Sequence, residues 1–223
     1  MFSVIFGVQP KDGRFDEYLG YAKLLKPEIE RIDGFIDNER FASRRNPAHV
    51  LSHSTWRDEK ALIRWRTVAV HHEIQEKGRF EVFADYHLRV GEIVADTHVP
   101  TGQILQQQRF DETEIGDARV VTIVEISPET SSKPAENQAR LETPAAETIG
   151  LVDVELFESI YNPGKLLILS SWRDATALAG TTRSRITDGD AVRRRTVRII
   201  RDYGMFARQE APQYYRDITT AKP

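Results

Sequence analysis

One face of a predicted helix carries the best candidate for chemistry in this chain. At the spacing i, i+3, i+7 and i+10 stand Leu62, Trp65, Ala69 and His72, and residues so spaced share one side of a helix. An imidazole is a general base near neutral pH, and an indole beside it offers an apolar wall to a flat ligand. This face therefore places an aromatic wall and a candidate base on one side of a helix, where they could line a pocket.

The elements that must position this face occur twice. Residues 34–62 read GFIDNERFASRRNPAHVLSHSTWRDEKAL and residues 150–178 read GLVDVELFESIYNPGKLLILSSWRDATAL, with 14 identities in 29 positions at an offset of 116. Unrelated segments of ordinary composition share roughly two identities over that length. The chain is therefore a tandem duplication, and features that both copies keep are expected to be scaffold.

The two copies differ at the candidate site. At the same offset the second copy has, in order, Leu178, Thr181, Arg185 and Asp188, so the indole and the imidazole are both missing. All six histidines precede residue 100. A single working pocket is therefore expected in the first unit, and the second unit is expected to complete the packing.

Composition sets the broad class. The 223 residues carry 31 Lys+Arg and 34 Asp+Glu, a net charge of −3 that argues against nucleic-acid binding and against a polybasic membrane surface. There is no cysteine, which excludes disulfides and thiolate metal sites. No apolar run reaches the length of a membrane span. The segment MFSVIFGVQP reads as a strand and not as a signal peptide, so a cytoplasmic protein is expected.

The order of expected elements is the same in both units. The first unit reads as a strand at 2–8, a helix at 13–32 that Pro27 should interrupt, a hairpin at 34–56, a helix at 58–77 and a strand at 79–90. The second reads as a strand at 119–126, a weaker helix at 135–147, a hairpin at 150–172, a helix from 174 and a strand at 192–206. Each unit is thus an α+β, ferredoxin-like β-α-β-β-α-β arrangement.

Four segments follow from this order. The predicted boundaries are 1–91 for the first domain, 92–117 for a linker or arm, 118–210 for the diverged second domain and 211–223 for a tail. Helices cover only one face of such a sheet, and an exposed apolar face favours association. We therefore expect the two sheets to pack face to face as a pseudo-dimer within the chain. The sequence leaves open whether whole chains associate further.

A family resemblance rests on two runs. Residues 54–90, STWRDEKALIRWRTVAVHHEIQEKGRFEVFADYHLRV, together with GFIDNERF, closely resemble the antibiotic biosynthesis monooxygenase (ABM) family. The resemblance covers about 2–91 and extends more weakly to the second unit through GLVDVELFES and LSSWRDATAL. It implies two fused copies of a domain that forms a dimeric ferredoxin-like α+β barrel. The family includes oxygenases that oxidise phenols or quinols without metal or flavin, and also haem-degrading enzymes.

The resemblance implies a monooxygenase that needs no cofactor and no metal and that acts with O₂ on an aromatic or quinol-type substrate. His72 would be the catalytic base, and the substrate-binding residues would be Trp65, Leu62, Arg66 and Tyr86. Removal of a phenolic proton gives an anion that can pass an electron to O₂. The His71–His72 step does not indicate a metal site, because adjacent residues on a helix diverge.

Two alternative functions remain open at this stage. The family's haem degraders use an Asn on the first strand with a Trp and a His on the second helix, whereas Phe2–Val8 contains no Asn and the step from Trp65 to His72 is shorter than theirs. A non-catalytic binder of a hydrophobic metabolite is the other alternative, and a His72 that points to solvent would favour it.

Several residues are interpreted as structural. Trp56 and Trp172 are expected in the core, and Asp58 and Asp174 as helix N-caps. Tyr18 and Tyr21 are expected in the core in preference to a pocket. The acidic residues shared by both units are expected to form a polar set at their interface: Asp37, Glu39, Asp153 and Glu155.

Overall fold

The computed structural model of the protein describes residues 1–128, 134–180 and 191–212. The first unit contains β1 (Phe2–Pro10), α1 (Phe15–Glu30), β2 (Phe35–Ser43), β3 (Val50–Trp56), α2 (Glu59–Arg66), α3 (Ala69–Lys77), the π-helical turn η1 (Gly78–Val82) and β4 (Phe83–Asp96). The second contains β5 (Val120–Ile126), α4 (Ala135–Glu142), β6 (Leu151–Ser159), β7 (Leu166–Trp172), α5 (Ala175–Ala179) and β8 (Val192–Gly204).

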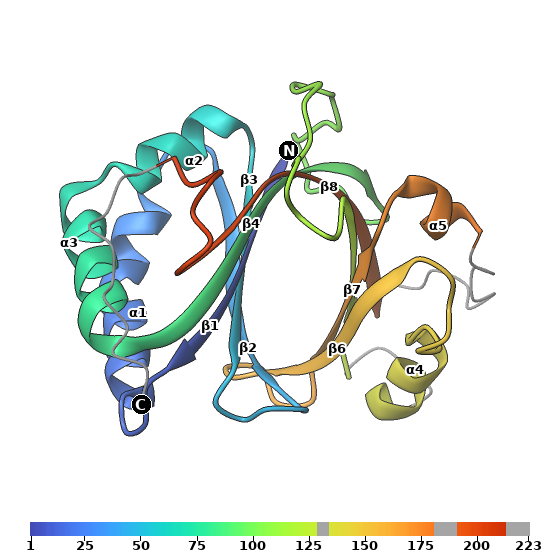
Figure 1. Ribbon diagram of the computed structural model, residues 1–223, viewed down its shortest axis with the longest axis horizontal. Coiled ribbons are helices and arrows are strands. Elements are labelled where there is room, and N and C mark those ends of the chain that lie inside the picture. Colours follow the sequence, from blue (N-terminus) through green and yellow to red (C-terminus); the bar gives the residue numbers. More distant parts are fainter. Residues whose placement is uncertain (129–133, 181–190, 213–223) are drawn as a thin grey trace.

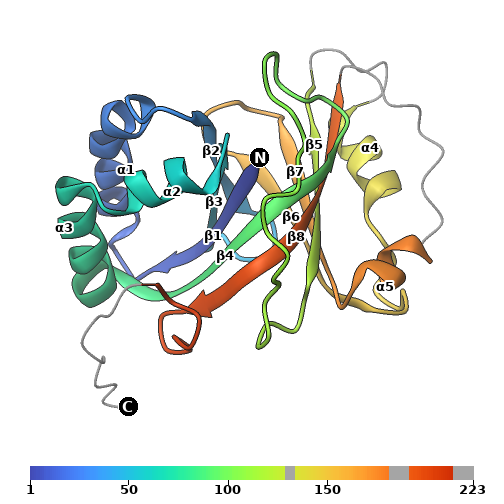
Figure 2. The ribbon, with the colours of Figure 1, turned by 90° about the horizontal axis from the view of Figure 1, so that it is seen from above.

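The two units close into one barrel. The sheet of the first unit has the order β4-β1-β3-β2, and that of the second has the equivalent order β8-β5-β7-β6. Antiparallel pairing of β2 with β6 and of β4 with β8 joins the sheets at both edges. Figures 1 and 2 show α1, α2 and α3 on one side of this barrel and α4 and α5 on the other. The predicted pair of ferredoxin-like units is confirmed, and closure pairs the edge strands of each sheet with those of the other.

The inner faces of both sheets form the shared core. Residues at alternate strand positions point inward, and the largest buried cluster draws on both units: Met1, Ile5, Phe41, Leu51, Ile93, Val121, Ile123, Phe157, Leu167, Leu169, Val197 and Ile199. The apolar faces that an isolated unit would expose therefore cover each other, which is the expected face-to-face packing.

Polar contacts across the barrel repeat with the duplication. The Ser43 hydroxyl donates to Glu155 Oε1 at 2.5 Å, and the Ser159 hydroxyl donates to Glu39 Oε1 at 2.5 Å. Ser43 and Ser159 are 116 positions apart, and so are Glu39 and Glu155, so the duplication relates one contact to the other. Together with ion pairs from Arg45 to Asp153 and from Arg193 to Asp37, they confirm the predicted inter-unit acidic set.

Scaffold predictions drawn from the repeat also hold. Trp56 and Trp172 are buried, at 0% and 2% exposure. The Asp58 carboxylate accepts from the Ala61 amide at 2.8 Å, and Asp174 accepts from Ala177 at 2.8 Å. Both aspartates therefore cap helices, as expected.

Several element boundaries differ from the prediction. Residues 78–82 form η1 ahead of the strand expected from 79, and α4 ends at Glu142, before the predicted 147. The helix expected over 58–77 is two helices, α2 and α3, separated at Thr67 and Val68. Helix α1 continues through Pro27 instead of breaking there. Strand β4 runs to Asp96, so the first residues of the predicted linker are strand. None of the helices in the described part of the chain has the length and apolar character that crossing a membrane would require.

Candidate functional site

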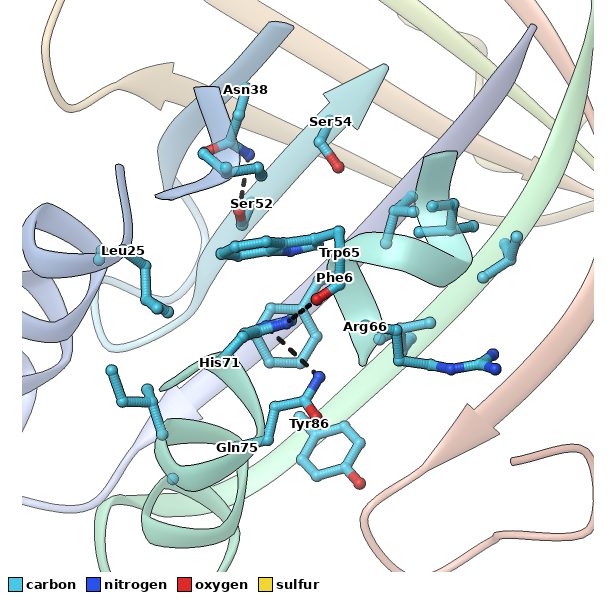
Figure 3. A pocket seen from close by; sticks show the side chains of 18 of the residues that line it. Phe6, Leu25, Asn38, Ser52, Ser54, Trp65, Arg66, His71, Gln75 and Tyr86 are labelled. Atoms are coloured by element: carbon cyan, nitrogen blue, oxygen red, sulfur yellow. Dashed lines mark hydrogen bonds between the residues drawn. The ribbon is translucent and has the colours of Figure 1, made fainter. Parts of the chain in front are cut away.

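A cavity of about 220 Å³ lies between the outer face of the first unit's sheet and helices α1, α2 and α3. Figure 3 shows it from close by, with Trp65 and His71 over strands that carry Phe6 and Ser52. Its volume is somewhat below the roughly 300–1,000 Å³ of typical ligand pockets. The cavity therefore suits a compact molecule.

Strand register explains the floor of this cavity. Outward-facing positions align in two rows across β2, β3, β1, β4 and β8. One row reads Asn38, Ser54, Val4, Val90 and Arg201, and the next reads Arg40, Ser52, Phe6, Leu88 and Tyr203. The floor is therefore apolar along β1 and β4 and polar at both sides.

The second unit supplies part of this wall. Arg201 and Tyr203 come from β8, and Arg208 follows that strand. The Arg208 guanidinium donates to the Tyr86 hydroxyl at 2.6 Å, and Arg79 donates to the same hydroxyl at 3.3 Å and to the Met205 carbonyl at 2.6 Å. Pairing of β4 with β8 thus brings the second unit into the first unit's site.

Positive charge predominates around the cavity. Among the described residues that line it, the cationic ones are Lys26, Arg40, Arg66, Arg79, Arg201 and Arg208, and the acidic one is Glu59. The Glu59 carboxylate is held by Arg109, with both oxygens 2.8 Å from Nη1. An apolar interior with a cationic surround favours an apolar molecule that carries an anionic group.

Trp65 and His71 form the aromatic part of the roof. Their rings stack with centroids 4.0 Å apart and planes 14° apart. His71 Nδ1 lies 3.0 Å from the Trp65 carbonyl oxygen, and Gln75 Nε2 lies 3.3 Å from His71 Nε2. Because a carbonyl only accepts, Nδ1 must carry the proton. His71 Nε2 then has the basic lone pair and accepts from the Gln75 amide.

Burial keeps this imidazole neutral. It lowers the pKa of His71 to about 4, although the hydrogen bond to the Trp65 carbonyl acts in the opposite direction. At neutral pH His71 is therefore a fixed, uncharged ring with a known tautomer. A neutral imidazole is the form that a general base must have before proton transfer.

Four of the five predicted site residues line the cavity: Leu62, Trp65, Arg66 and Tyr86. His72 does not, because it is exposed on the outer side of α3, and the expectation that it faces the pocket is wrong. The reason is the interruption at Thr67 and Val68, which ends the helical face that begins at Leu62. Beyond the interruption, the helix turns its neighbour His71 inward.

Sequence reasoning missed other lining residues. Asn38, Arg40 and Ser52 lie on the hairpin, and alternation along its strands would have placed them opposite the inward Phe41 and Leu51. Tyr18 lines the cavity as well as packing in the core. The predicted continuous helix placed His71 about 100° round from the candidate face, beside Val68 and Gln75, so it was a weaker candidate for the base than His72.

The other unit's counterpart of this site falls largely outside the described residues, which exclude Thr181, Arg185 and Asp188. Within the described ranges, no group of three or more His, Asp or Glu side chains is placed to hold a metal ion.

Comparisons with known proteins agree on one family. The family model described as antibiotic biosynthesis monooxygenase matches residues 1–77. A protein named jasmonate monooxygenase ABM, from Pyricularia oryzae, is 39% identical over 219 residues, which is 96% of this chain and 98% of that protein. That relative is similar to this chain across both units.

Solved structures add a likeness of fold. An aldoxime dehydratase is 9% identical, with a TM-score of 0.53 over 89% of this chain and 80% of its own. An anthrone oxidase-like protein is 12% identical, with a TM-score of 0.32 over 95% of this chain and 96% of its own. The first of these shows a shared architecture and nothing further.

Proposed function

This chain belongs to the antibiotic biosynthesis monooxygenase family, and from that premise we propose that it oxidises a small apolar acid with O₂ in the first unit's cavity. His71 is the general base in this proposal and takes the role that the sequence pattern assigned to His72. The observation that carries the proposal is the neutral His71 ring, stacked on Trp65 with its unprotonated Nε2 inside the cavity. An incoming substrate proton replaces the 3.3 Å hydrogen bond that Nε2 accepts from Gln75.

The chemistry needs a substrate whose ionisation makes it electron-rich. His71 Nε2 accepts a proton from a phenol or from a CH₂ group beside a carbonyl, and the resulting anion passes one electron to O₂. Recombination forms a C–O bond, and loss of water from the peroxide turns CH₂ into C=O. The balance is CH₂ + O₂ → C=O + H₂O, so the substrate supplies all the electrons and no separate reductant is required.

His71 becomes a stronger base as this reaction proceeds. An imidazole with a pKa near 4 is a weak base in the empty cavity. An anion that forms beside it favours the imidazolium and raises the pKa of the ring in the complex. The negative charge formed on the substrate thus offsets the low pKa of His71.

The substrate class proposed is a cyclopentanone or aromatic ring that bears an acid group. The 39% identical relative is named for jasmonate, which is a cyclopentanone with a carboxylate side chain. Such a molecule has an acidic C–H beside its ketone, which suits the His71 base. Its apolar body suits the floor of Val4, Phe6 and Leu88, and its negative charge suits the surrounding guanidinium groups. Quinol-type aromatics share the acidic proton and remain in the test panel.

The test is oxygen uptake with jasmonate, hydroquinones and anthrones, in the presence of EDTA and with no flavin or metal added. General-base catalysis contributes roughly 10²–10⁴-fold, so His71→Ala should lower kcat/KM by at least about 100-fold on the accepted substrate. His72→Ala is the matched control, since it removes the neighbouring exposed imidazole. Equal rates for wild type and His71→Ala would remove His71 from the mechanism, and uptake that depends on an added cofactor would refute the cofactor-free reaction.

The two alternatives are less well supported. Haem is a large macrocycle, and a cavity of about 220 Å³ is small even for typical ligands; a Soret shift on mixing with hemin would nevertheless revive that alternative. Exposure of His72 would favour a binding-only protein, but His71 supplies a base inside the cavity. Tight binding of jasmonate with no oxygen uptake would establish the binding-only function.

A further inference from the structure

Two hydrogen-bond donors in the cavity have no partner in the part of the chain that the structure describes. The Tyr18 hydroxyl and Arg40 Nε are both buried and make no hydrogen bond to any described residue. Both residues line the cavity. Buried polar groups are almost always satisfied, so two unsatisfied groups in one ligand-sized cavity require an explanation.

The Arg40 guanidinium is held in place from one side. Its Nη1 donates to Asn38 Oδ1 at 3.0 Å, and the Asn38 amide donates in turn to the Ser52 hydroxyl at 3.1 Å and to the His53 carbonyl at 3.0 Å. These bonds fix Asn38 with its oxygen toward Arg40. Arg40 is therefore pre-positioned on β2, while its Nε–H stays unused by the described residues.

Tyr18 is equally constrained. Its side chain is 6% exposed, in a cluster with Val8, Val50 and Val82, and its ring packs edge-on against Phe83 at 5.9 Å. Burial raises the pKa of Tyr18, and the nearby Arg40 charge opposes that change only in part. The hydroxyl therefore keeps its proton and remains a donor. The Arg40 guanidinium lies close enough to lower this pKa through a hydrogen-bonding contact as well as through its charge. That contact falls outside the geometry of a full hydrogen bond, so both groups keep unused capacity.

We propose that Tyr18 and Arg40 form an oxyanion subsite, which binds the oxygen of the substrate that becomes negatively charged when the proton is removed. The inference rests on the proposed function for the reaction but not for the binding. A phenolate or enolate oxygen accepts from both donors at once, whereas an apolar group at the same place leaves both unsatisfied. Donors positioned before the reaction are the usual means of stabilising such an anion.

The experiment measures binding and needs no turnover. The probes are p-nitrophenol, whose ionisation is visible by absorbance, and p-nitrotoluene, which has the same shape without the hydroxyl. Wild type should bind p-nitrophenolate at least about tenfold more tightly than p-nitrotoluene and should lower the pKa of the bound phenol by about one unit or more. Tyr18→Phe and Arg40→Met should each reduce both effects severalfold.

A matched control lies on the same helix. The Tyr21 hydroxyl already donates to Glu17 at 3.1 Å, so Tyr21→Phe should keep the pKa shift of the bound phenol. Tyr18→Phe retains the packed ring, and near-ultraviolet circular dichroism checks that each variant is folded.

Each result of these binding measurements either supports or overturns the Tyr18–Arg40 subsite. No preference for the phenolate in wild type, including no binding of either probe, would overturn the subsite, and so would a preference that both variants retain. A preference lost in Tyr18→Phe but kept in Tyr21→Phe supports it. If oxygen uptake fails for every substrate while the phenolate preference is present, the proposed reaction fails and the subsite stands.

Discussion

His71 and His72 show how one position along a helix separates two environments. The first ring is stacked on Trp65 inside the cavity, and the second is exposed to water. Burial holds the pKa of His71 near 4, against an ordinary value of 6.5. The folded protein therefore resists a proton that the unfolded chain accepts readily. The stabilising contribution of His71 is complete above about pH 6.5 and is lost as the pH falls through about 4.

This linkage gives a prediction for stability. Between about pH 7 and pH 5, His71 should lower the free energy of unfolding by about 2 kcal/mol, and His71→Gln should lack that component. Urea unfolding at both pH values gives the change in the free energy of unfolding between pH 7 and pH 5. The contribution of His71 is the difference between that change in wild type and in the variant. If the free energy of unfolding of His71→Gln depended on pH as that of wild type does, the neutral, buried ring would be contradicted.

Among single residues, the sequence predicted four that line the cavity, but it placed His72 there instead of His71. Helical spacing assumed one helix from 58 to 77, and neither Gly nor Pro marks its interruption. The interruption depends on local bonds, because the Thr67 hydroxyl donates back to the Ile63 and Arg64 carbonyls at the end of α2. Such a competition between side chain and backbone is hard to recognise from composition alone.

At the scale of the elements, both units repeat one tight contact between a glycine before a strand and an alanine of a helix. Gly34 and Gly150 have φ of +93° and +80°, and each directly precedes a strand that begins beside a helix. An added Cβ would lie 2.7 Å from Ala61 Cβ in the first unit and 2.3 Å from Ala177 Cβ in the second. All four residues recur at the offset of 116, so the duplication preserved both partners of the contact.

Replacing this glycine should therefore be costly. Gly34→Ala faces both a left-handed backbone and the Ala61 methyl, and we expect a loss of at least about 1 kcal/mol in the free energy of unfolding. Gly20→Ala is the matched control. Gly20 is an exposed residue of α1, and nothing lies within 4 Å of the added methyl. The substitution should therefore raise the free energy of unfolding by about 0.5–1 kcal/mol. Chemical denaturation compares them, and equal effects would mean that the contact does not constrain the fold.

The order of elements could be predicted from the sequence because hydrophobic period and repeat agree. The strand-helix-strand-strand-helix-strand order and the caps at Asp58 and Asp174 follow from local signals. Continuity of α1 through Pro27 did not follow, since a proline normally ends a helix. Packing of Leu25 and Ile29 against Trp56 and Trp65 in one buried cluster holds the helix on both sides of that residue.

The whole molecule is held by charges as well as by its apolar core. Inside the barrel, Lys165 of the second unit pairs with Glu39 of the first and lies 2.7 Å from Glu125, while Arg195 also pairs with Glu125. Burial alone would raise the pKa of Glu39, but hydrogen bonds from Lys165, Ser159 and Asn162 lower it below its ordinary value. The Glu39 carboxylate thus stays charged because side chains of the second unit donate hydrogen bonds to it.

Removing the lysine should expose this dependence. Lys165→Met leaves Glu39 and Glu125 with one cation fewer, and unpairing buried charges typically costs about 3–5 kcal/mol. We expect a loss of about 3 kcal/mol in the free energy of unfolding, measured by denaturant titration at neutral pH. Lys60→Met, at an exposed position, should change stability by less than about 0.5 kcal/mol. A neutral effect of Lys165→Met would show that the ion pairs do not hold the units together.

At the scale of the whole chain, the duplication predicted the pseudo-dimer but not how far the halves intermix. Nothing in the hydrophobic period of β8 indicates that Arg201 and Tyr203 extend the first unit's floor, because strand pairing between units is set by the closed barrel. The predicted role of the second unit as a structural partner was therefore too narrow.

Sharing the floor has an evolutionary consequence. Because Arg201 and Tyr203 of the second unit line the first unit's cavity, removal of the second unit would remove part of the cavity wall. A fused chain of this kind is therefore not free to lose its second unit, since the cavity of the first is built partly from it.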